Sequence, residues 1–387
     1  MPHHAIRAVL APILATLVAL AAVPALAQTY ETRAAHAILI DYDTNTVLFR
    51  KEADASMPPA SMAKLMTMAV VFAAIRDGRL TLDDEFLVSE NAWRSGGASS
   101  GGSTMFAELG SSIRLEDLMR GIIIQSANDG CIIVAEGMAG SEAAFADLMN
   151  LEARRIGLTG SHFRNATGLP DPEQYVAARD LATLAHHIIA TYPEFYKIYS
   201  ETEFTWNDIT QRNRNPLLDM NIGADGMKTG FTEESGYGLV GSAVRDGQRL
   251  IAVINGTATE KERAEEARKL IDWGFRAFER IALFADGEVI GEASVFHGDQ
   301  AGVGLVSKGA IDVLLPLGFT DQMRGRIVYQ GPIPAPIEAG QEIGTLQITI
   351  NNETLREAKV YAASDVGGGS LTQRAVDGLQ ELLLGWW

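Results

Sequence analysis

The order of strand-like and helix-like segments constrains the fold of this 387-residue chain more than any other feature of its sequence. Runs of β-branched and apolar residues suggest two strand pairs, at residues 37–40 and 47–49 and, much later, at residues 237–244 and 250–255. Between these pairs, apolar residues recur mainly with the spacing of helices. A sheet with strands from both ends of a largely helical segment is an α+β domain, which we place at residues 28–282.

A second domain is expected after about residue 283, where short apolar runs alternate with Gly, Pro and Asn. The strand-like runs cover residues 288–296, 326–329 and 346–350. We therefore predict a small all-β domain at residues 283–363. Pro332, Pro334 and Pro336 are expected in a loop, where the missing N–H of proline does no harm.

The first residues are typical of a signal peptide. Arg7 precedes an apolar run at about residues 8–23, and Ala25 and Ala27 fit a small-residue cleavage site. The run is shorter than the roughly 20 residues that a membrane-spanning helix needs. We predict a signal peptide at residues 1–27 and export of the mature chain, with an uncleaved membrane anchor as the alternative.

The chain closes with a glycine-rich stretch and an amphipathic segment. Residues 364–369 include three consecutive glycines and are predicted to form a flexible linker. In residues 370–387 the apolar side chains recur at helical spacing, and the segment finishes with Trp386 and Trp387. We predict an amphipathic helix in a membrane interface, because about 18 residues with charges on one face cannot span a bilayer. A helix docked on the protein's own core is the alternative.

Composition excludes several classes of function. Lys plus Arg of 32 against Asp plus Glu of 49 gives a net charge of −17, which argues against nucleic acid as a partner. Cys131 is the only cysteine, so a thiolate metal cluster is not available, and we expect it to pack as a small apolar residue. The seven histidines include no HExxH pair, and we predict neither a metal site nor a cofactor.

A serine and a lysine share one turn after two prolines. Pro58 and Pro59 favour a helix start, so Ser61 falls in the first turn and Lys64 follows three positions later on the same face. The free N–H groups of a helix start favour a developing anion. A serine hydroxyl needs a base to act as a nucleophile, and an amine at this spacing can accept its proton. The alternative is an ordinary helix with a polar stripe.

Two further polar groups stand at predicted structural boundaries. Ser126 and Asn128 can face one cleft only from a non-helical turn, and a helix cap is the alternative. Lys228, Thr229 and Gly230 follow turn-forming residues at a predicted strand edge. There a cation and a hydroxyl can hold a carboxylate, while a glycine lets a ligand approach the backbone closely. A solvated edge lysine is the alternative.

In this order, the three elements match the set of serine penicillin-binding proteins and β-lactamases. Nearly the whole mature chain resembles the D-alanyl-D-alanine carboxypeptidases of the low-molecular-mass penicillin-binding protein family. Beyond the motifs, the stretches that carry this resemblance are Arg120-Gly121-Ile122, Gln125-Ser126, Gly168-Leu169, Ala178-Arg179-Asp180, Arg212-Asn213-Arg214-Asn215 and Trp273-Gly274-Phe275. The resemblance implies a β-lactamase/transpeptidase-like domain, with an antiparallel sheet and a helical subdomain, followed by a β-rich domain and an amphipathic membrane anchor. It also implies a location at the periplasmic face of the bacterial inner membrane.

The resemblance implies acyl transfer from peptidoglycan pentapeptide stems that end in D-alanyl-D-alanine. Ser61 would attack the penultimate carbonyl with Lys64 as its base, and β-lactam antibiotics would acylate the same serine. Ser126 would pass the proton to the departing amine, and Asn128 would orient Lys64 and the substrate amide.

Ligand binding is implied for residues on the predicted strand edge. Lys228 and Thr229 would hold the terminal carboxylate, and the backbone N–H groups of Ser61 and Phe231 would hold the oxyanion. Phe231 departs from the histidine that often follows this glycine in the family. Arg263 resembles an arginine that lies near the carboxylate pocket in relatives.

The nearest alternative is a serine β-lactamase, which needs a carboxylate to activate water for deacylation. Residues 165–169 lack the expected Glu-x-x-x-Asn arrangement, which leaves Glu173 as the candidate. A D,D-endopeptidase is disfavoured by the second domain and the anchor, and a non-catalytic cell-wall-binding protein by the presence of all the reactive side chains. Residues 95–103 are expected to form a mobile flap beside the cleft, and His186 and His187 to have no catalytic role.

Overall fold

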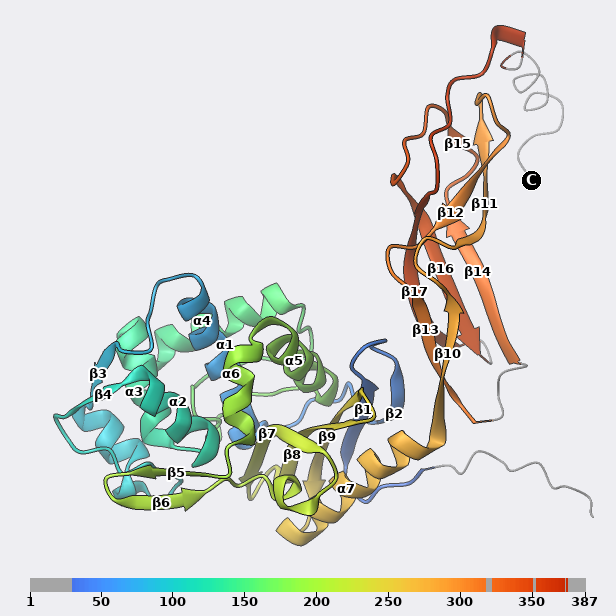
Figure 1. Cartoon of the computed structure of the whole chain (residues 1–387). Helices are drawn as coiled ribbons and strands as arrows, with labels where there is room; N and C mark the ends of the chain where they lie inside the picture. The colour runs from blue at the N-terminus through green and yellow to red at the C-terminus, as the bar shows by residue number, and fades with distance from the viewer. Residues whose placement is uncertain (1–29, 318–321, 351–352, 373, 375–387) are drawn as a thin grey trace, which may run out of the picture.

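The computed structural model describes residues 30–317, 322–350, 353–372 and 374. The predicted signal peptide, and residues 375–387 of the predicted C-terminal helix with both terminal tryptophans, lie outside the described residues. Figure 1 shows a mixed helix and sheet domain followed by an elongated domain of strands. The predicted α+β domain with an all-β domain behind it is therefore confirmed.

A five-stranded antiparallel sheet forms the centre of the first domain. Its strands are β1 (His36–Asp41), β2 (Val47–Lys51), β7 (Ala224–Thr232), β8 (Gly236–Arg245) and β9 (Gln248–Thr257), in the order β2-β1-β9-β8-β7. The N-terminal β1 pairs with the late β9, with Ile38 opposite Val253. Both predicted strand pairs therefore join in one sheet, and β7 forms one of its edges.

Helices cover one face of this sheet. They are α1 (Lys64–Arg76), α2 (Leu115–Ile124), α3 (Asn128–Ala139), α4 (Glu142–Ile156), α5 (Ala178–Thr191) and α6 (Pro193–Tyr196). The centre of the layer is α1, which is apolar on almost every side and is buried from Lys64 to Ala74. Its burial places the only lysine of the helix inside the largest hydrophobic core.

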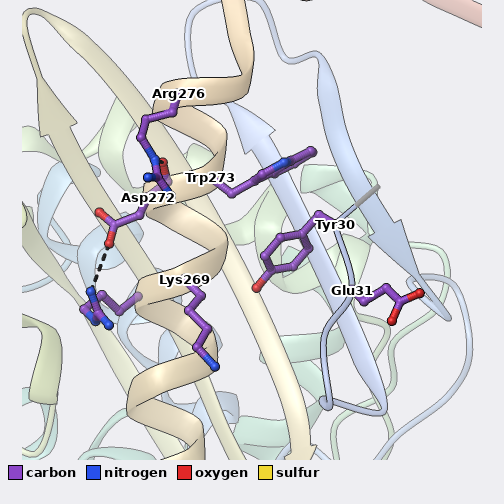
Figure 2. Close-up of a pocket in the computed structure, with 7 residues that line it drawn as sticks. Tyr30, Glu31, Lys269, Asp272, Trp273 and Arg276 are labelled. Atoms are coloured by element: carbon purple, nitrogen blue, oxygen red, sulfur yellow. Dashed lines mark hydrogen bonds and ion pairs between the residues drawn. The ribbon is translucent and has the colours of Figure 1, made fainter. Parts of the chain in front are cut away.

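A single long helix, α7 (Glu260–Ala277), covers the opposite face. Thr259 caps its start by accepting a hydrogen bond from the Glu262 N–H, at 3.1 Å. Gly274 allows close packing on the sheet, because a Cβ there would lie 2.5 Å from Leu39 Cδ2. Figure 2 shows Tyr30 and Trp273 side by side next to α7, with ring centroids 5.1 Å apart, so aromatic packing fixes the first described residues against this helix.

Two small two-stranded antiparallel sheets interrupt the helical middle and were not predicted. They are β3 (Glu85–Leu87) with β4 (Ser112–Arg114), and β5 (Glu203–Trp206) with β6 (Ile209–Arg212). Asn207 and Asp208 connect β5 to β6 with φ angles of 48° and 58°. Positive φ at both turn residues is typical of a tight hairpin, and Asn and Asp tolerate it better than most residues.

The second domain, which we call the β-domain, consists of strands around a separate core. These are β10 (Phe278–Phe284), β11 (Val289–Phe296), β12 (Gly302–Val306), β13 (Ile311–Pro316), β14 (Met323–Tyr329), β15 (Ile333–Pro334), β16 (Glu342–Ile350) and β17 (Glu353–Ala362). β10 pairs with β13, and the others form a six-stranded sheet in the order β14-β16-β17-β12-β11-β15. Pro334 lies on the edge strand β15 rather than in a loop, which an edge tolerates.

The glycine-rich stretch expected to be a flexible linker is held by backbone hydrogen bonds. Val366 pairs with Ile337, and Gly368 pairs with Gly298. The Gly369 N–H donates to the His297 carbonyl at 2.8 Å. Three consecutive glycines suggested a flexible backbone, but the β-domain supplies hydrogen-bond partners for the backbone of this stretch.

Candidate active site

Ser61 lies on a short 3-10 turn, Ala60–Ala63, that leads directly into α1. We expected the first turn of an α-helix, and the tighter turn places Ser61 just ahead of the helix with Lys64 as its first residue. The turn begins at Ala60, whose φ of 46° is unusual for a residue with a Cβ. Such strain is common where a side chain must be aimed into a cleft.

The amine of Lys64 is buried and surrounded by oxygen atoms. Its Nζ lies 3.0 Å from Ser61 Oγ, 2.8 Å from Asn128 Oδ1 and 2.5 Å from the Thr167 carbonyl oxygen. Only 1% of Lys64 is exposed, and this burial lowers the pKa of its amine below the usual lysine value. The nearby Arg214 guanidinium also lowers this pKa. An amine with a lowered pKa loses its own proton more readily, and within hydrogen-bond distance of a hydroxyl it is placed to accept one.

Ser126 and Asn128 lie at the bend between α2 and α3. Ser126 adopts a left-handed φ of 63°, and Asn128 is the first residue of α3. The cap position before α3 is Ala127, with no side-chain cap bond, so the helix-cap interpretation of Ser126 is wrong. The bend directs Ser126 Oγ to Lys228 Nζ at 3.0 Å and Asn128 Oδ1 to Lys64.

Lys228 projects from the edge strand β7 into the same site. It is 3% exposed, so it is not a solvated edge lysine. Burial, followed by the charge of Lys64, lowers the pKa of its amine well below the usual lysine value. Among the described residues, no carboxylate lies within ion-pair distance of either amine. Two buried amines without a carboxylate partner leave a place for an anionic ligand.

Gly230 packs closely against the protein itself, and its expected role in ligand approach stays a prediction. A Cβ there would lie 3.1 Å from Ala60 Cβ and 3.2 Å from Met62 Cγ, so glycine lets β7 pack on the turn that carries Ser61. The neighbouring Thr229 is 5% exposed, and its carbonyl oxygen accepts a hydrogen bond from Lys228 Nζ at 3.0 Å.

A loop between α4 and α5 supplies groups that the sequence did not single out. The Thr167 carbonyl contacts Lys64, and Asn165 Oδ1 accepts hydrogen bonds from the Thr167 and Gly168 N–H groups. Gly168 has a φ of +82°, and a Cβ there would lie 1.9 Å from the Ala60 carbonyl oxygen. The loop therefore fits closely against the turn that carries Ser61.

A cleft of about 300 Å³ opens above these groups. Its lining includes Ser61, Asn128, Thr167, Arg214 and Phe231. Arg214 is an exposed cation. The sequence identified it only as part of Arg212-Asn213-Arg214-Asn215, one of the stretches that resemble the family, and not as a site residue. Residues 101–103 also line the cleft, which confirms that the glycine- and serine-rich segment lies beside it.

Arg263 lies outside the lining of the cleft. Its guanidinium is 5.6 Å from the centre of the Tyr237 ring and 2.7 Å from Glu260 Oε1. The side chain is 4% exposed, although its charge still lowers the pKa of Lys228. Arg263 thus acts on the site from behind Tyr237.

The remaining candidates are elsewhere. Glu173 is 69% exposed and forms an ion pair with Arg164 at 3.4 Å, so it does not line the cleft. His186 and His187 lie on α5, also away from the cleft lining, and Cys131 is buried in the core. Within the described part of the chain, no group of His, Cys, Asp or Glu could hold a metal ion.

A serine beside a buried amine, at the edge of an antiparallel sheet covered by helices, is typical of a serine acyl-transferring hydrolase. A family model described as D-alanyl-D-alanine carboxypeptidase matches residues 22–259, and one described as penicillin-binding protein 5, C-terminal domain, matches residues 278–367. The chain therefore belongs to the D-alanyl-D-alanine carboxypeptidase family of serine peptidases.

Individual relatives match between 64% and 88% of the chain. The D-alanyl-D-alanine carboxypeptidase DacC of Escherichia coli is 38% identical over 88% of this chain and 86% of its own length. The crystal structure of penicillin-binding protein 5 from Haemophilus influenzae is 36% identical, with a TM-score of 0.79 over 88% of this chain and 99% of that one. Penicillin-binding protein D2 from Listeria monocytogenes, solved in an ampicillin-bound form, is 28% identical with a TM-score of 0.56 over 64% of this chain and 99% of that one.

Proposed function

We propose that Ser61 forms an acyl-enzyme with peptidoglycan pentapeptide stems and releases their terminal D-alanine. The Ser61 oxygen bonds to the penultimate carbonyl carbon, the C–N bond to the terminal D-alanine breaks, and water then hydrolyses the ester. The observation that carries this proposal is the 3.0 Å separation between Ser61 Oγ and the buried Lys64 Nζ, whose pKa is lowered. Family membership and the penicillin-binding relatives support the choice of substrate and of β-lactams as acylating inhibitors.

The proton follows the polar groups of the site. Lys64 accepts it from the Ser61 hydroxyl, and Ser126, 3.0 Å from Lys228, passes a proton to the departing amine. Asn128 fixes the Lys64 amine through its 2.8 Å contact and orients the substrate amide. The backbone N–H groups of Ser61 and Phe231 hold the oxyanion, an arrangement for which each donor is worth about 3 kcal/mol in barrier height.

The terminal carboxylate of the substrate is held by cations at the edge of β7. Lys228 and Thr229 bind it, and the exposed Arg214 in the cleft lining adds a second positive charge. A bound carboxylate favours the protonated form of Lys228, and the charged Lys228 in turn favours a neutral Lys64. Substrate binding therefore prepares Lys64 to act as the base.

The membrane and export proposals rest on the sequence. Residues 1–27 act as a signal peptide, and residues 370–387 form an amphipathic helix that anchors the exported chain at the periplasmic face of the inner membrane. None of the helices in the described part of the chain is long and apolar enough to cross a membrane. A chain ending at residue 369 is expected to move from the membrane fraction to the soluble fraction of the cell envelope; retention on the membrane would contradict the anchor.

The function is tested by exposing the mature protein to a labelled penicillin and, separately, to a pentapeptide that ends in D-alanyl-D-alanine. Stable labelling together with release of D-alanine is the expected result. Rapid penicillin turnover without peptide cleavage would instead identify a β-lactamase. Ser61→Ala is expected to abolish labelling and D-alanine release while the circular dichroism spectrum is preserved, and labelling of this variant would overturn the assignment.

A further inference from the structure

Two large apolar side chains stand exposed around the otherwise polar cleft. Leu169 and Phe231 are each 43% exposed, and both line the cleft that contains Ser61. Leu169 belongs to the loop between α4 and α5, whereas Phe231 belongs to the edge strand β7. Scattered exposed apolar residues need no explanation. Two such residues that come from separate elements and lie beside one nucleophile indicate a ligand-binding surface.

The Phe231 ring is held in place from behind. It stacks on Tyr237, with ring centroids 4.1 Å apart and planes at 29°. Tyr237 is in turn covered by the Arg263 guanidinium, 5.6 Å from its ring centre. Because Tyr237, backed by Arg263, packs on one face of the Phe231 ring, rotation of this ring is restricted. Little conformational entropy is therefore lost when a ligand packs on its exposed side.

Leu169 is held just as firmly by its own backbone. Its carbonyl oxygen accepts hydrogen bonds from Asn165 Nδ2 at 3.0 Å and from Gln174 Nε2 at 2.9 Å. The preceding Gly168 packs against the Ala60 carbonyl group. The backbone from which the leucine side chain projects is therefore held at a fixed position beside the serine turn.

We propose that Leu169 and Phe231 form an apolar clamp that selects acyl donors with an apolar group on the acyl side of the scissile bond. This proposal rests on the proposed function of Ser61. The departing D-alanine offers only a methyl group beside its carboxylate, which is little apolar surface for two exposed side chains to bury. The acyl half offers more, either as the alkyl side chain of the residue before the two D-alanines or as the aromatic side chain of a penicillin.

The clamp is tested with two β-lactams that share one ring system and one carboxylate. Benzylpenicillin carries a phenylacetyl group on the acyl side, whereas 6-aminopenicillanic acid carries none. The measured quantity is the ratio of their second-order acylation rate constants. We expect this ratio to fall about tenfold in Phe231→Ala and about threefold in Leu169→Ala, the range of an aromatic contact and of a few buried methyl groups. Phe231→Tyr and Leu169→Met should keep the ratio of the natural chain.

A ratio separates selection of the acyl side from general damage to the site. If Phe231→Ala slows both penicillins equally, the side chain acts only through the backbone donor or the fold, and the clamp is overturned. A tripeptide pair, diacetyl-L-lysyl-D-alanyl-D-alanine and acetylglycyl-D-alanyl-D-alanine, should show the same loss of preference, and an unchanged peptide ratio would also overturn it. Absence of acylation in the natural chain would instead refute the proposed function of Ser61.

Discussion

The catalytic domain and the β-domain bury very different kinds of side chain. The catalytic domain buries ionisable groups such as Lys64, Asp129 and Lys228 within or beside its core. Among the described residues of the β-domain, only Ser307 is both polar and buried. Burial of a charged or polar group costs free energy unless it is fully paired, so a domain that needs only to pack avoids it. The buried amines beside Ser61, those of Lys64 and Lys228, therefore set the catalytic domain apart from the β-domain.

Asp129 shows how the catalytic domain makes such burial tolerable. Its carboxylate accepts hydrogen bonds from Thr104 Oγ1 and from the N–H groups of Met105, Ala107 and Gly130. These bonds tie the segment behind the cleft-lining residues to the start of α3. Lys64 and Lys228 have no such complete compensation, and their lowered pKa values reflect it.

Removal of one buried amine is expected to have the largest effect on the catalytic domain. Lys64→Met is expected to lower the acylation rate constant about 10³-fold, because the serine loses its base. The free energy of unfolding should change by no more than about 2 kcal/mol, since three oxygen atoms lose a partner while the burial of an amine is relieved. Labelling with penicillin and thermal unfolding measure the two effects.

A lysine of the β-domain provides the matched control. Lys359 lies on β17, is 62% exposed and pairs with Glu342 at 2.8 Å. Lys359→Met should leave both acylation and thermal unfolding as they are in the natural chain, because an exposed ion pair contributes little. If Lys64→Met retained acylation within tenfold, another group would have to be the base.

Two glycines with similar backbone angles give the next comparison. Gly168 has a φ of +82° and Gly340 in the β-domain one of +80°, but only a Cβ at Gly168 would meet a neighbour, the Ala60 carbonyl oxygen. Gly340→Ala should cost about 1 kcal/mol of stability from backbone strain alone. Gly168→Ala should cost at least about 3 kcal/mol, because strain and overlap add, and it should also slow acylation.

Calorimetry of the two alanine variants, with penicillin labelling, measures this difference. If Gly168→Ala and Gly340→Ala were equally destabilised, the loop that contains Gly168 would have to move away from the serine turn at no cost in stability. Slower acylation in Gly340→Ala would show that the β-domain transmits strain to the cleft, and the contrast between the domains would then fail.

Strong local patterns allowed much of this structure to be predicted. The strands around residues 37–49 and 237–255 alternate or cluster β-branched residues, and their union in one sheet followed from the helical segment between them. Ser61 and Lys64 were found because a serine nucleophile demands a base at short spacing, and Lys228 because Lys228-Thr229-Gly230 completes the motif set that the chain resembles. Their meeting at one cleft needed three separate elements to fold together.

Other parts of the site could not be predicted from the sequence, because no residue type or spacing indicates them. The Thr167 carbonyl contacts Lys64 through the backbone, which no residue type encodes. Arg214 resembles any exposed arginine until the fold brings it to the cleft. Gly230 also packs closely on the protein's own Ala60 and Met62, which was not predicted because sequence does not tell which partner comes close to a glycine.

The smallest expected effect concerns the contact between the two regions. Arg280 on β10 reaches Asp43 at 2.6 Å, Asp41 at 3.8 Å and Asp312 at 3.7 Å, and is 37% exposed. Arg280→Gln should lower stability by less than about 1 kcal/mol, because the pairs are partly solvated and Asp41 keeps its hydrogen bonds to Thr44.

Salt distinguishes an ionic contact between the domains from a packed one. The effect of Arg280→Gln on thermal unfolding should shrink as ionic strength rises from about 0.01 M to about 1 M, where screening shortens from roughly 30 Å to roughly 3 Å. Arg280→Lys, which keeps the charge, should lose less than Arg280→Gln at low salt. A stability loss above about 2 kcal/mol that does not change with salt would mean that Arg280 is part of a core shared by both domains. The two domains would then fold as one unit rather than separately.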